Sequence, residues 1–231
     1  HRIIGAEVLA RLHDEELGFI RPDIFITVAE RSGSITQLGE QVFEKACLFL
    51  AEHPLRELGL ERLNLNLSPI QCRDSHMAEH LCCIAQRHKV PIHSFRFEIT
   101  ESALSYEQRL RQNMDMLIAQ GAVISLDDFG TGYSNLMRVL KFPFEDVKLD
   151  MTFVRAYFDQ TNKLLPAIIE GFQSFGVQIT AEGIENKQMA DTLTRLGCRI
   201  LQGFYFAKPL PPGEFLHYLK TTAPQVGSHV D

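Results

Sequence analysis

Acidic and amide side chains recur at one kind of position in this sequence, the end of short apolar runs. The carboxylates and amides concerned are Glu7, Asn66, Glu98, Asp127, Asp128, Glu182 and Gln202, and Lys148 occupies a similar place in a further run. A single acid at such a position usually caps a helix or meets solvent. Because the pattern recurs in several runs, we expect these groups to converge and act together.

Five carboxylates in one place require compensating positive charge. At an effective dielectric near 20, two anions about 4 Å apart repel by about 4 kcal/mol, so an uncompensated set would exceed a typical domain's stability. A shared proton could relieve one or two acids, but the number of oxygen donors favours hard divalent cations, Mg²⁺ or Mn²⁺. The adjacent Asp127 and Asp128 suggest two ions, which implies phosphoryl chemistry. Lys148 is either a structural ion-pair partner or a group that orients a metal-bound water.

The runs that carry these residues alternate with helical patterns. Strands are predicted at 62–68, 95–100, 122–127, 146–150, 177–182 and 199–206, and helices at 36–52, 75–89, 105–121, 161–176, 186–197 and 213–220. Ser105 begins a capping-box pattern, and Thr161 and Asn186 are expected to cap two later helices. Such alternation predicts parallel strands joined by helical crossovers. No proline-rich or charge-rich linker interrupts it, so we expect residues 1–231 to form one domain.

The strand sequences favour an α/β fold closed as a TIM-like (β/α)8 barrel. Apolar and polar residues alternate in the runs 63–67 and 146–150, and helices outside a barrel would cover the apolar face. The polar residues Asn64, Asn66, Asp146, Lys148 and Asp150 would then face inward, and the carboxyl ends of the strands would share one mouth. An antiparallel sheet with one solvated face is the alternative.

Composition limits the partners and the compartment. The chain has 23 basic and 29 acidic residues, a net charge of −6, so a polymeric nucleic acid bound through a field of cations is not expected. No run approaches the roughly 18 apolar residues that a membrane span needs. The five cysteines form no Cys-x-x-Cys pair, which favours reduced thiols in the cytoplasm, and no targeting signal is visible.

Seven motifs, in order along nearly the whole chain, resemble the EAL domain family, the bacterial phosphodiesterases of cyclic di-GMP. They are GAEVLAR at 5–11, NLNLSP at 64–69, FEITES at 97–102, DDFGTGYS at 127–134, VKLD at 147–150, AEGIE at 181–185 and LQGF at 201–204. The resemblance implies a TIM-like barrel that hydrolyses one phosphodiester of cyclic di-GMP to linear pGpG by a two-metal mechanism.

The resemblance also implies roles for individual residues. It assigns metal binding, by two Mg²⁺ or Mn²⁺ ions, to Glu7, Asn66, Glu98, Asp127, Asp128 and Glu182; catalysis to Lys148, Glu182 and Glu7; and substrate contact to Leu9, Arg11 and Gln202. Glu101 and the loop residues Phe129, Gly130, Thr131, Gly132, Tyr133 and Ser134 would couple the metal site to a homodimer interface. Upstream sensory or regulatory domains are expected in the intact protein, which could be anchored to a membrane.

Two departures and several alternatives accompany this interpretation. The family's usual first strand, with its Gln-Pro pair, precedes the position where this chain begins, so we expect an absent strand and weaker substrate binding. Leu12 stands where the family commonly has an aromatic residue. A receptor or interaction module that binds cyclic di-GMP without turnover, and a scaffold with no nucleotide role, remain alternatives. The pattern His76-x-x-Glu79-His80 could bind zinc, although helix packing explains it better.

Overall fold

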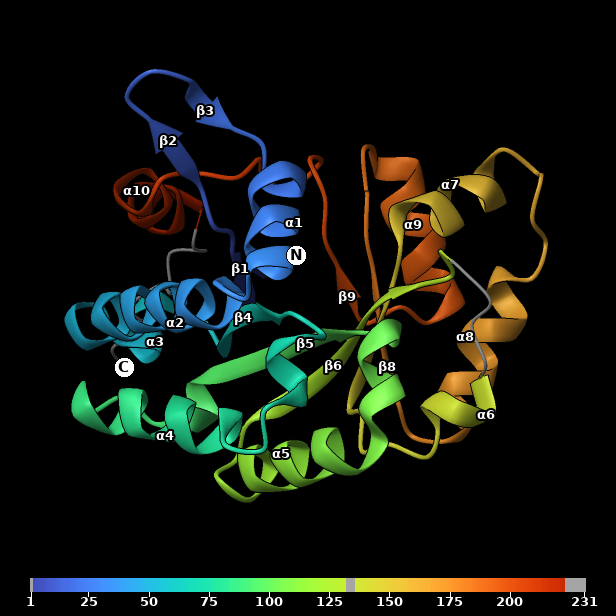
Figure 1. Cartoon of the computed structure of the whole chain (residues 1–231). Coiled ribbons are helices and arrows are strands. Elements are labelled where there is room, and N and C mark those ends of the chain that lie inside the picture. The colour runs from blue at the N-terminus through green and yellow to red at the C-terminus, as the bar shows by residue number, and fades with distance from the viewer. Residues whose placement is uncertain (1, 132–135, 223–231) are drawn as a thin grey trace, which may run out of the picture.

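The computed structural model describes residues 2–131 and 136–222. Its centre is a curled seven-stranded parallel sheet in the order β1-β4-β5-β6-β7-β8-β9, with helices around it (Figure 1). The strands are β1 (Gly5–Val8), β4 (Arg62–Leu67), β5 (Phe95–Thr100), β6 (Val123–Phe129), β7 (Asp146–Leu149), β8 (Gln178–Ala181) and β9 (Ile200–Leu201). The parallel order confirms the TIM-like architecture, and β1 and β9 form the two edges of the described sheet.

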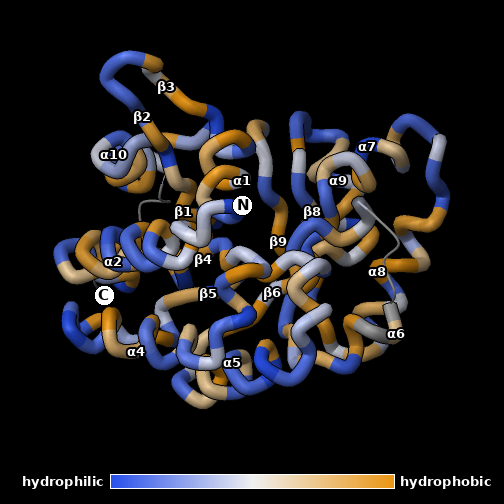
Figure 2. The backbone as a smooth tube through the Cα atoms, viewed as in Figure 1, coloured by the Kyte–Doolittle hydropathy of each residue, from blue (hydrophilic) through white to orange (hydrophobic). Residues whose placement is uncertain are grey.

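Helices connect each strand to the next, as expected for parallel neighbours. They are α1 (Pro22–Ser32), α2 (Ile35–Glu52), α3 (Leu55–Leu58), α4 (Met77–Arg87), α5 (Glu107–Ala119), α6 (Leu136–Val139), α7 (Met151–Phe158), α8 (Leu165–Ser174), α9 (Lys187–Leu196) and α10 (Pro212–Thr222). Figure 2 shows hydrophobic and hydrophilic stretches alternating along these helices. In the described ranges, no helix combines the length and apolar character that crossing a membrane requires.

The strands place apolar side chains outward and polar side chains inward. On β4, Leu63, Leu65 and Leu67 are buried in the core shared with the helices, whereas Asn64 and Asn66 bond to acids inside the barrel. This is the opposite of a solvated antiparallel sheet, and it confirms the alternation predicted from sequence. The interior of the barrel is therefore polar near its carboxyl end.

The predicted helix starts are partly wrong. Asn186 caps α9 by accepting a bond from Met189 N at 3.0 Å. Ser105, however, lies in the 3-10 helix Glu101–Tyr106, and α5 begins after it without a side-chain cap. Thr161 Oγ1 donates instead to Ala156 O at 3.0 Å, beyond the end of α7 at Phe158, and α8 begins only at Leu165. The Thr161 hydroxyl bonds to a preceding carbonyl instead of capping the next helix, and a local pattern does not reveal such competition.

A small hairpin between β1 and α1 was not predicted. Its strands β2 (Leu12–Asp14) and β3 (Gly18–Ile20) pair antiparallel, and Figure 1 shows the hairpin projecting away from the parallel sheet. Asp14 Oδ1 accepts bonds from Glu16 N and Leu17 N, both at 2.9 Å, and Gly18 has φ of 71°. These contacts close the turn. Strands of three residues are too short for an alternation pattern to be recognised.

Candidate functional site

The ammonium group of Lys148 lies among four carboxylates at the mouth of the barrel. Its Nζ is 2.8 Å from Glu98 Oε2, 2.8 Å from Glu182 Oε1, 3.2 Å from Asp127 Oδ1 and 3.9 Å from Glu7 Oε2. The Lys148 side chain is only 1% exposed. One buried cation therefore faces four acids.

Parallel register explains why residues distant in sequence meet here. Asn66 pairs with Glu98 across β4 and β5, and Thr100 pairs with Asp127 across β5 and β6. Glu182 directly follows β8, whose Ala181 pairs with Leu149. Because parallel strands all end on the same side of a sheet, the inward side chains at their carboxyl ends converge.

Three amide side chains hold the acids in place. Asn66 Nδ2 donates to Glu7 Oε1 at 2.6 Å, and Asn64 Nδ2 donates to Glu98 Oε1 at 2.7 Å. Gln202 Nε2 donates to Glu7 Oε2 at 2.7 Å. Since Gln202 follows β9 and Glu7 lies on β1, this bond links the two edges of the sheet. Asn64 is a member of the site that the family resemblance did not supply, although its inward direction was predicted.

A β-bulge brings Asp127 and Asp128 to the mouth together. The register of β6 with β7 shifts between Leu126 and Phe129, and Asp128 has a left-handed φ of 56°. Asp128 N donates to Asp127 Oδ1 at 2.9 Å. The extra residue lets both acids reach the mouth while Phe129 returns to the core.

The acids are short of positive charge. Burial raises the pKa of Glu98 to about 8 and that of Glu182 to about 7, although Lys148 opposes both shifts. Burial also raises the pKa of Asp128, and Asp127 adds to the effect. For Lys148, burial alone would lower the pKa, but attraction by the surrounding acids raises it well above its ordinary value. One lysine does not neutralise this set.

The donor set fits a hard divalent cation. Carboxylate oxygens of Asp127, Asp128 and Glu182 all lie within 4.8 Å of one another. Among the described residues, these three side chains form the group of His, Cys, Asp or Glu that could hold one metal ion. Oxygen donors of this kind suit Mg²⁺ or Mn²⁺ better than softer metals. Glu7 and Glu98 lie beside the same lysine, and Asn66 bonds to Glu7, so these residues extend the set.

The predicted substrate residues differ in their contacts. Gln202 contacts Glu7, as described above. Leu9 and Arg11 follow β1 and are exposed, and the Arg11 guanidinium donates to the Ala10 carbonyl at 2.9 Å rather than to the acids. Gln202 thus belongs to the cluster, whereas the Arg11 guanidinium bonds to its own neighbour's carbonyl.

The predicted coupling loop is only partly described. Glu101 begins the 3-10 helix after β5, and Phe129 is buried. Gly130 has φ of 104°, and a Cβ there would lie 2.7 Å from the Phe153 ring. Thr131 Oγ1 donates to Asp128 O at 3.0 Å, which ties the loop to the site. Gly132, Tyr133 and Ser134 lie outside the described residues.

Two other sequence patterns have local explanations. Asp150, predicted to face inward, instead caps α7 by accepting a bond from Thr152 N at 2.7 Å. His76 faces Glu79 at 3.2 Å, whereas His80 faces Glu40 at 3.4 Å, so the two imidazoles bond to different acids. Helix packing therefore accounts for the histidine pattern, as the sequence favoured.

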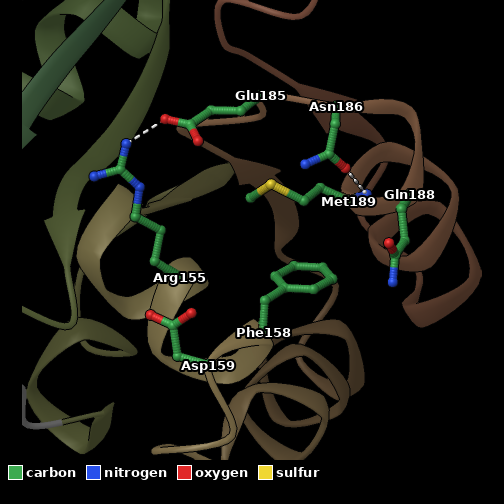
Figure 3. A pocket seen from close by; sticks show the side chains of 7 residues that line it. All are labelled: Arg155, Phe158, Asp159, Glu185, Asn186, Gln188 and Met189. Atoms are coloured by element: carbon green, nitrogen blue, oxygen red, sulfur yellow. Dashed lines mark hydrogen bonds and ion pairs between the residues drawn. The ribbon is translucent and has the colours of Figure 1, made fainter.

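A separate cavity of about 450 Å³ lies between α7 and α9 (Figure 3). Its lining residues are Arg155, Phe158, Asp159, Glu185, Asn186, Gln188 and Met189. Figure 3 shows Arg155 and Glu185 joined as an ion pair on one side of this cavity. None of the acids around Lys148 lines it.

Known proteins resemble this chain over nearly all of its length. The family model described as EAL domain matches residues 1–209. The cyclic di-GMP phosphodiesterase RocR of Pseudomonas aeruginosa is 35% identical over 94% of this chain and 56% of its own length. The cyclic di-GMP phosphodiesterase PdeR of Escherichia coli K12 is 35% identical over 93% of this chain and 33% of its own length.

A solved structure agrees with the fold. The PaMucR phosphodiesterase in its c-di-GMP complex matches with a TM-score of 0.82 and 30% identity, covering 90% of this chain and 85% of that one. The chain spans about half the length of RocR and a third of PdeR. Those relatives therefore contain further regions with no counterpart in this sequence.

Proposed function

Because this chain belongs to the EAL domain family, we propose that it hydrolyses cyclic di-GMP to linear pGpG with two divalent metal ions. The observation that carries the proposal is the convergence of Glu7, Glu98, Asp127 and Glu182 on Lys148. A buried set with more acids than cations is suited to metal ions and, through them, to an anionic phosphodiester.

We assign the ions, Mg²⁺ or Mn²⁺, to Glu7, Asn66, Glu98, Asp127, Asp128 and Glu182. When bound, such ions polarise a phosphoryl oxygen and lower the pKa of a coordinated water. The described geometry supports this assignment because the oxygens of Asp127, Asp128 and Glu182 lie within 4.8 Å of one another. The bulge at Asp128 supplies two adjacent acids, which favours two ions over one.

The catalytic roles are assigned to Lys148, Glu182 and Glu7. Hydrolysis forms a bond from a water oxygen to phosphorus and breaks the bond from phosphorus to the 3′ oxygen. The water loses a proton, and the leaving oxygen gains one. Glu182, with a side chain 17% exposed, can be reached from solvent, whereas Glu98 is 0% exposed and forms the base of the cluster. Lys148 keeps its positive charge and orients the acids around the reacting water.

Substrate and partner assignments follow from position. Gln202 contacts Glu7, and Leu9 and Arg11 follow the strand that carries Glu7, so all three are proposed to contact the dinucleotide. We propose that Glu101 and the segment from Phe129 to Ser134 connect the mouth to a homodimer interface, because Thr131 bonds to Asp128. We also propose that the intact protein has attached regulatory domains and that this domain is cytoplasmic. The five cysteines are all unpaired thiols, which supports the proposed location.

A receptor that binds cyclic di-GMP without turnover is the second candidate. It is favoured by one observation: Lys148 Nζ lies within 3.2 Å of carboxylate oxygens of Glu98, Glu182 and Asp127. A lysine that pairs with these acids competes with divalent cations for the same oxygens. The two candidates differ in whether divalent cations enter the mouth.

Product analysis separates these candidates. The chain is incubated with cyclic di-GMP and Mg²⁺ or Mn²⁺, and the nucleotides are resolved chromatographically, with EDTA and Asp127→Asn as matched controls. We expect pGpG only from the wild type with metal. Binding of cyclic di-GMP without product supports the receptor, and neither binding nor product from a folded chain contradicts both.

A further inference from the structure

A second polar layer lies inside the barrel beneath the mouth. Its members come from four consecutive strands: Arg96 on β5, Ser125 on β6, Asp146 on β7 and Thr180 on β8. Each stands two positions before a mouth residue, namely Glu98, Asp127, Lys148 and Glu182. Side chains two positions apart on a strand share a face, so the lower layer lies directly under the cluster.

Asp146 is the centre of this lower layer. It is 0% exposed. Ser125 Oγ donates to Asp146 Oδ2 at 2.8 Å, and Thr180 Oγ1 donates to Asp146 Oδ1 at 2.9 Å. Arg96 Nη1 is 3.6 Å from Asp146 Oδ2, and the buried Arg96 Nε has no partner among the described residues. The carboxylate therefore binds the neighbouring strands on both sides of β7 chiefly through the two hydroxyls.

Stability alone does not account for a carboxylate at this depth. The interior of an α/β barrel is usually filled by branched apolar side chains. A buried ionic group can often be replaced by apolar residues of similar volume without loss of stability. Ser125, Asp146 and Thr180 thus form a polar network at a level that apolar side chains usually fill. A role in placing neighbouring groups explains the network better.

The β-bulge shows why such placement is needed. Ser125 pairs regularly with Asp146 and Leu126 with Val147, but the next aligned pair is Phe129 with Leu149. Lys148 therefore has no aligned residue on β6, at the level where it meets Asp127. The last polar contact below this irregularity is the bond from Ser125 to Asp146.

We propose that Asp146 is a positioning residue that holds β7 between β6 and β8 and thereby directs Lys148 onto the acids of the mouth. This inference rests on the proposed function, because it names what positions that site. Asp146 bonds to Ser125 and Thr180 in the layer below the mouth, so its proposed role is indirect. Its effect reaches the mouth through the backbone of β7, which spans only Asp146–Leu149.

The hydroxyl donors provide the test, because replacing Asp146 itself could prevent folding. Thr180→Val removes the donor and keeps the shape, whereas Thr180→Ser keeps the donor. Leu81→Ala, a buried residue of α4 outside the barrel, is the control for general loss of stability. For each chain we measure the melting temperature, binding of Mn²⁺ alone by calorimetry, and kcat and KM for cyclic di-GMP at a temperature where all are folded.

Thr180→Val is expected to weaken Mn²⁺ binding and to lower kcat, each by about tenfold, with KM changed by less than about twofold. Thr180→Ser should retain most of both quantities. Leu81→Ala should lower the melting temperature while leaving Mn²⁺ affinity and kcat unchanged. That pattern separates positioning from a contribution to stability alone.

Several outcomes would overturn the inference. If Thr180→Val loses only melting temperature, or if Leu81→Ala loses as much kcat as Thr180→Val, Asp146 has no positioning role. If the wild type binds Mn²⁺ but does not hydrolyse cyclic di-GMP, the proposed function fails, and the Mn²⁺ affinities of the Thr180 variants still decide this inference. A wild type that neither binds Mn²⁺ nor turns over substrate contradicts both.

Discussion

The barrel mouth and the cavity between α7 and α9 are both polar, yet their charges are arranged differently. In the cavity, Arg155 and Glu185 form one ion pair with side chains 45% and 50% exposed. In the mouth, Lys148 is 1% exposed and faces four carboxylates. An exposed pair is solvated and contributes little. A buried excess of one charge is costly without a further partner. Burial and charge imbalance therefore indicate chemistry better than cavity volume does.

The strongest test of this contrast is to remove one carboxylate from each region. Asp127→Asn or Glu7→Gln should lower turnover of cyclic di-GMP by about a thousandfold or more, because each removes a proposed metal ligand from the mouth. Both variants should keep the circular dichroism spectrum of the wild type. Asp159→Asn, in the cavity, should leave kcat unchanged. Normal turnover by either mouth variant would overturn the ligand assignment.

Removing the cation from each region should give the next largest difference. Lys148→Met leaves its buried acids without their partner, so we expect the metal-free chain to lose about 3 kcal/mol or more of unfolding free energy, measured with urea. Arg155→Met should cost less than about 1 kcal/mol, because its pair is exposed. Equal losses of unfolding free energy in the two variants would show that the lysine in the mouth is no more important for stability than the exposed arginine in the cavity.

Stability of the metal-free chain should depend on pH through the mouth. Burial raises the pKa of Glu98 to about 8 and of Glu182 to about 7, above ordinary values near 4.5. Between the ordinary and the raised pKa values, Glu98 and Glu182 hold more protons in the folded chain than in the unfolded chain. The free energy of unfolding therefore falls as pH rises from about 5 to 8. Urea melts in EDTA should show this slope, and Mg²⁺ should reduce it. A stability that rises with pH over that range would contradict the charge imbalance.

The smallest expected effect concerns the hairpin that follows β1. Leu12 lies on the exposed hairpin, at the position where the family resemblance led us to expect an aromatic residue. Leu12→Trp should add a surface for a guanine to stack on and lower KM for cyclic di-GMP by about threefold, with kcat unchanged. Leu17→Trp, at the turn of the same hairpin, is the matched control and should change neither constant. An equal fall in KM for both variants would indicate nonspecific adhesion to tryptophan.

Much of the fold and site was predictable because it depends on local periodicity. The alternation of apolar and polar residues on β4 and β7 predicted which side chains face inward, and Lys148 and Asn66 lie where that pattern placed them. The same reasoning failed at Asp150, whose carboxylate caps α7. A residue just past a strand can bond to the next helix, and periodicity carries no information about that competition.

The amino-acid order alone determined that acids end several strands, that helices separate those strands, and that the motifs match one family. These features are properties of short segments and their spacing, so they need no coordinates. The tertiary structure decided that Gln202 reaches Glu7 across the sheet edges, that a bulge brings Asp127 and Asp128 together, and that Ser125 and Thr180 hold Asp146. These contacts depend on strand register and closure, which arise only when distant segments pack against one another.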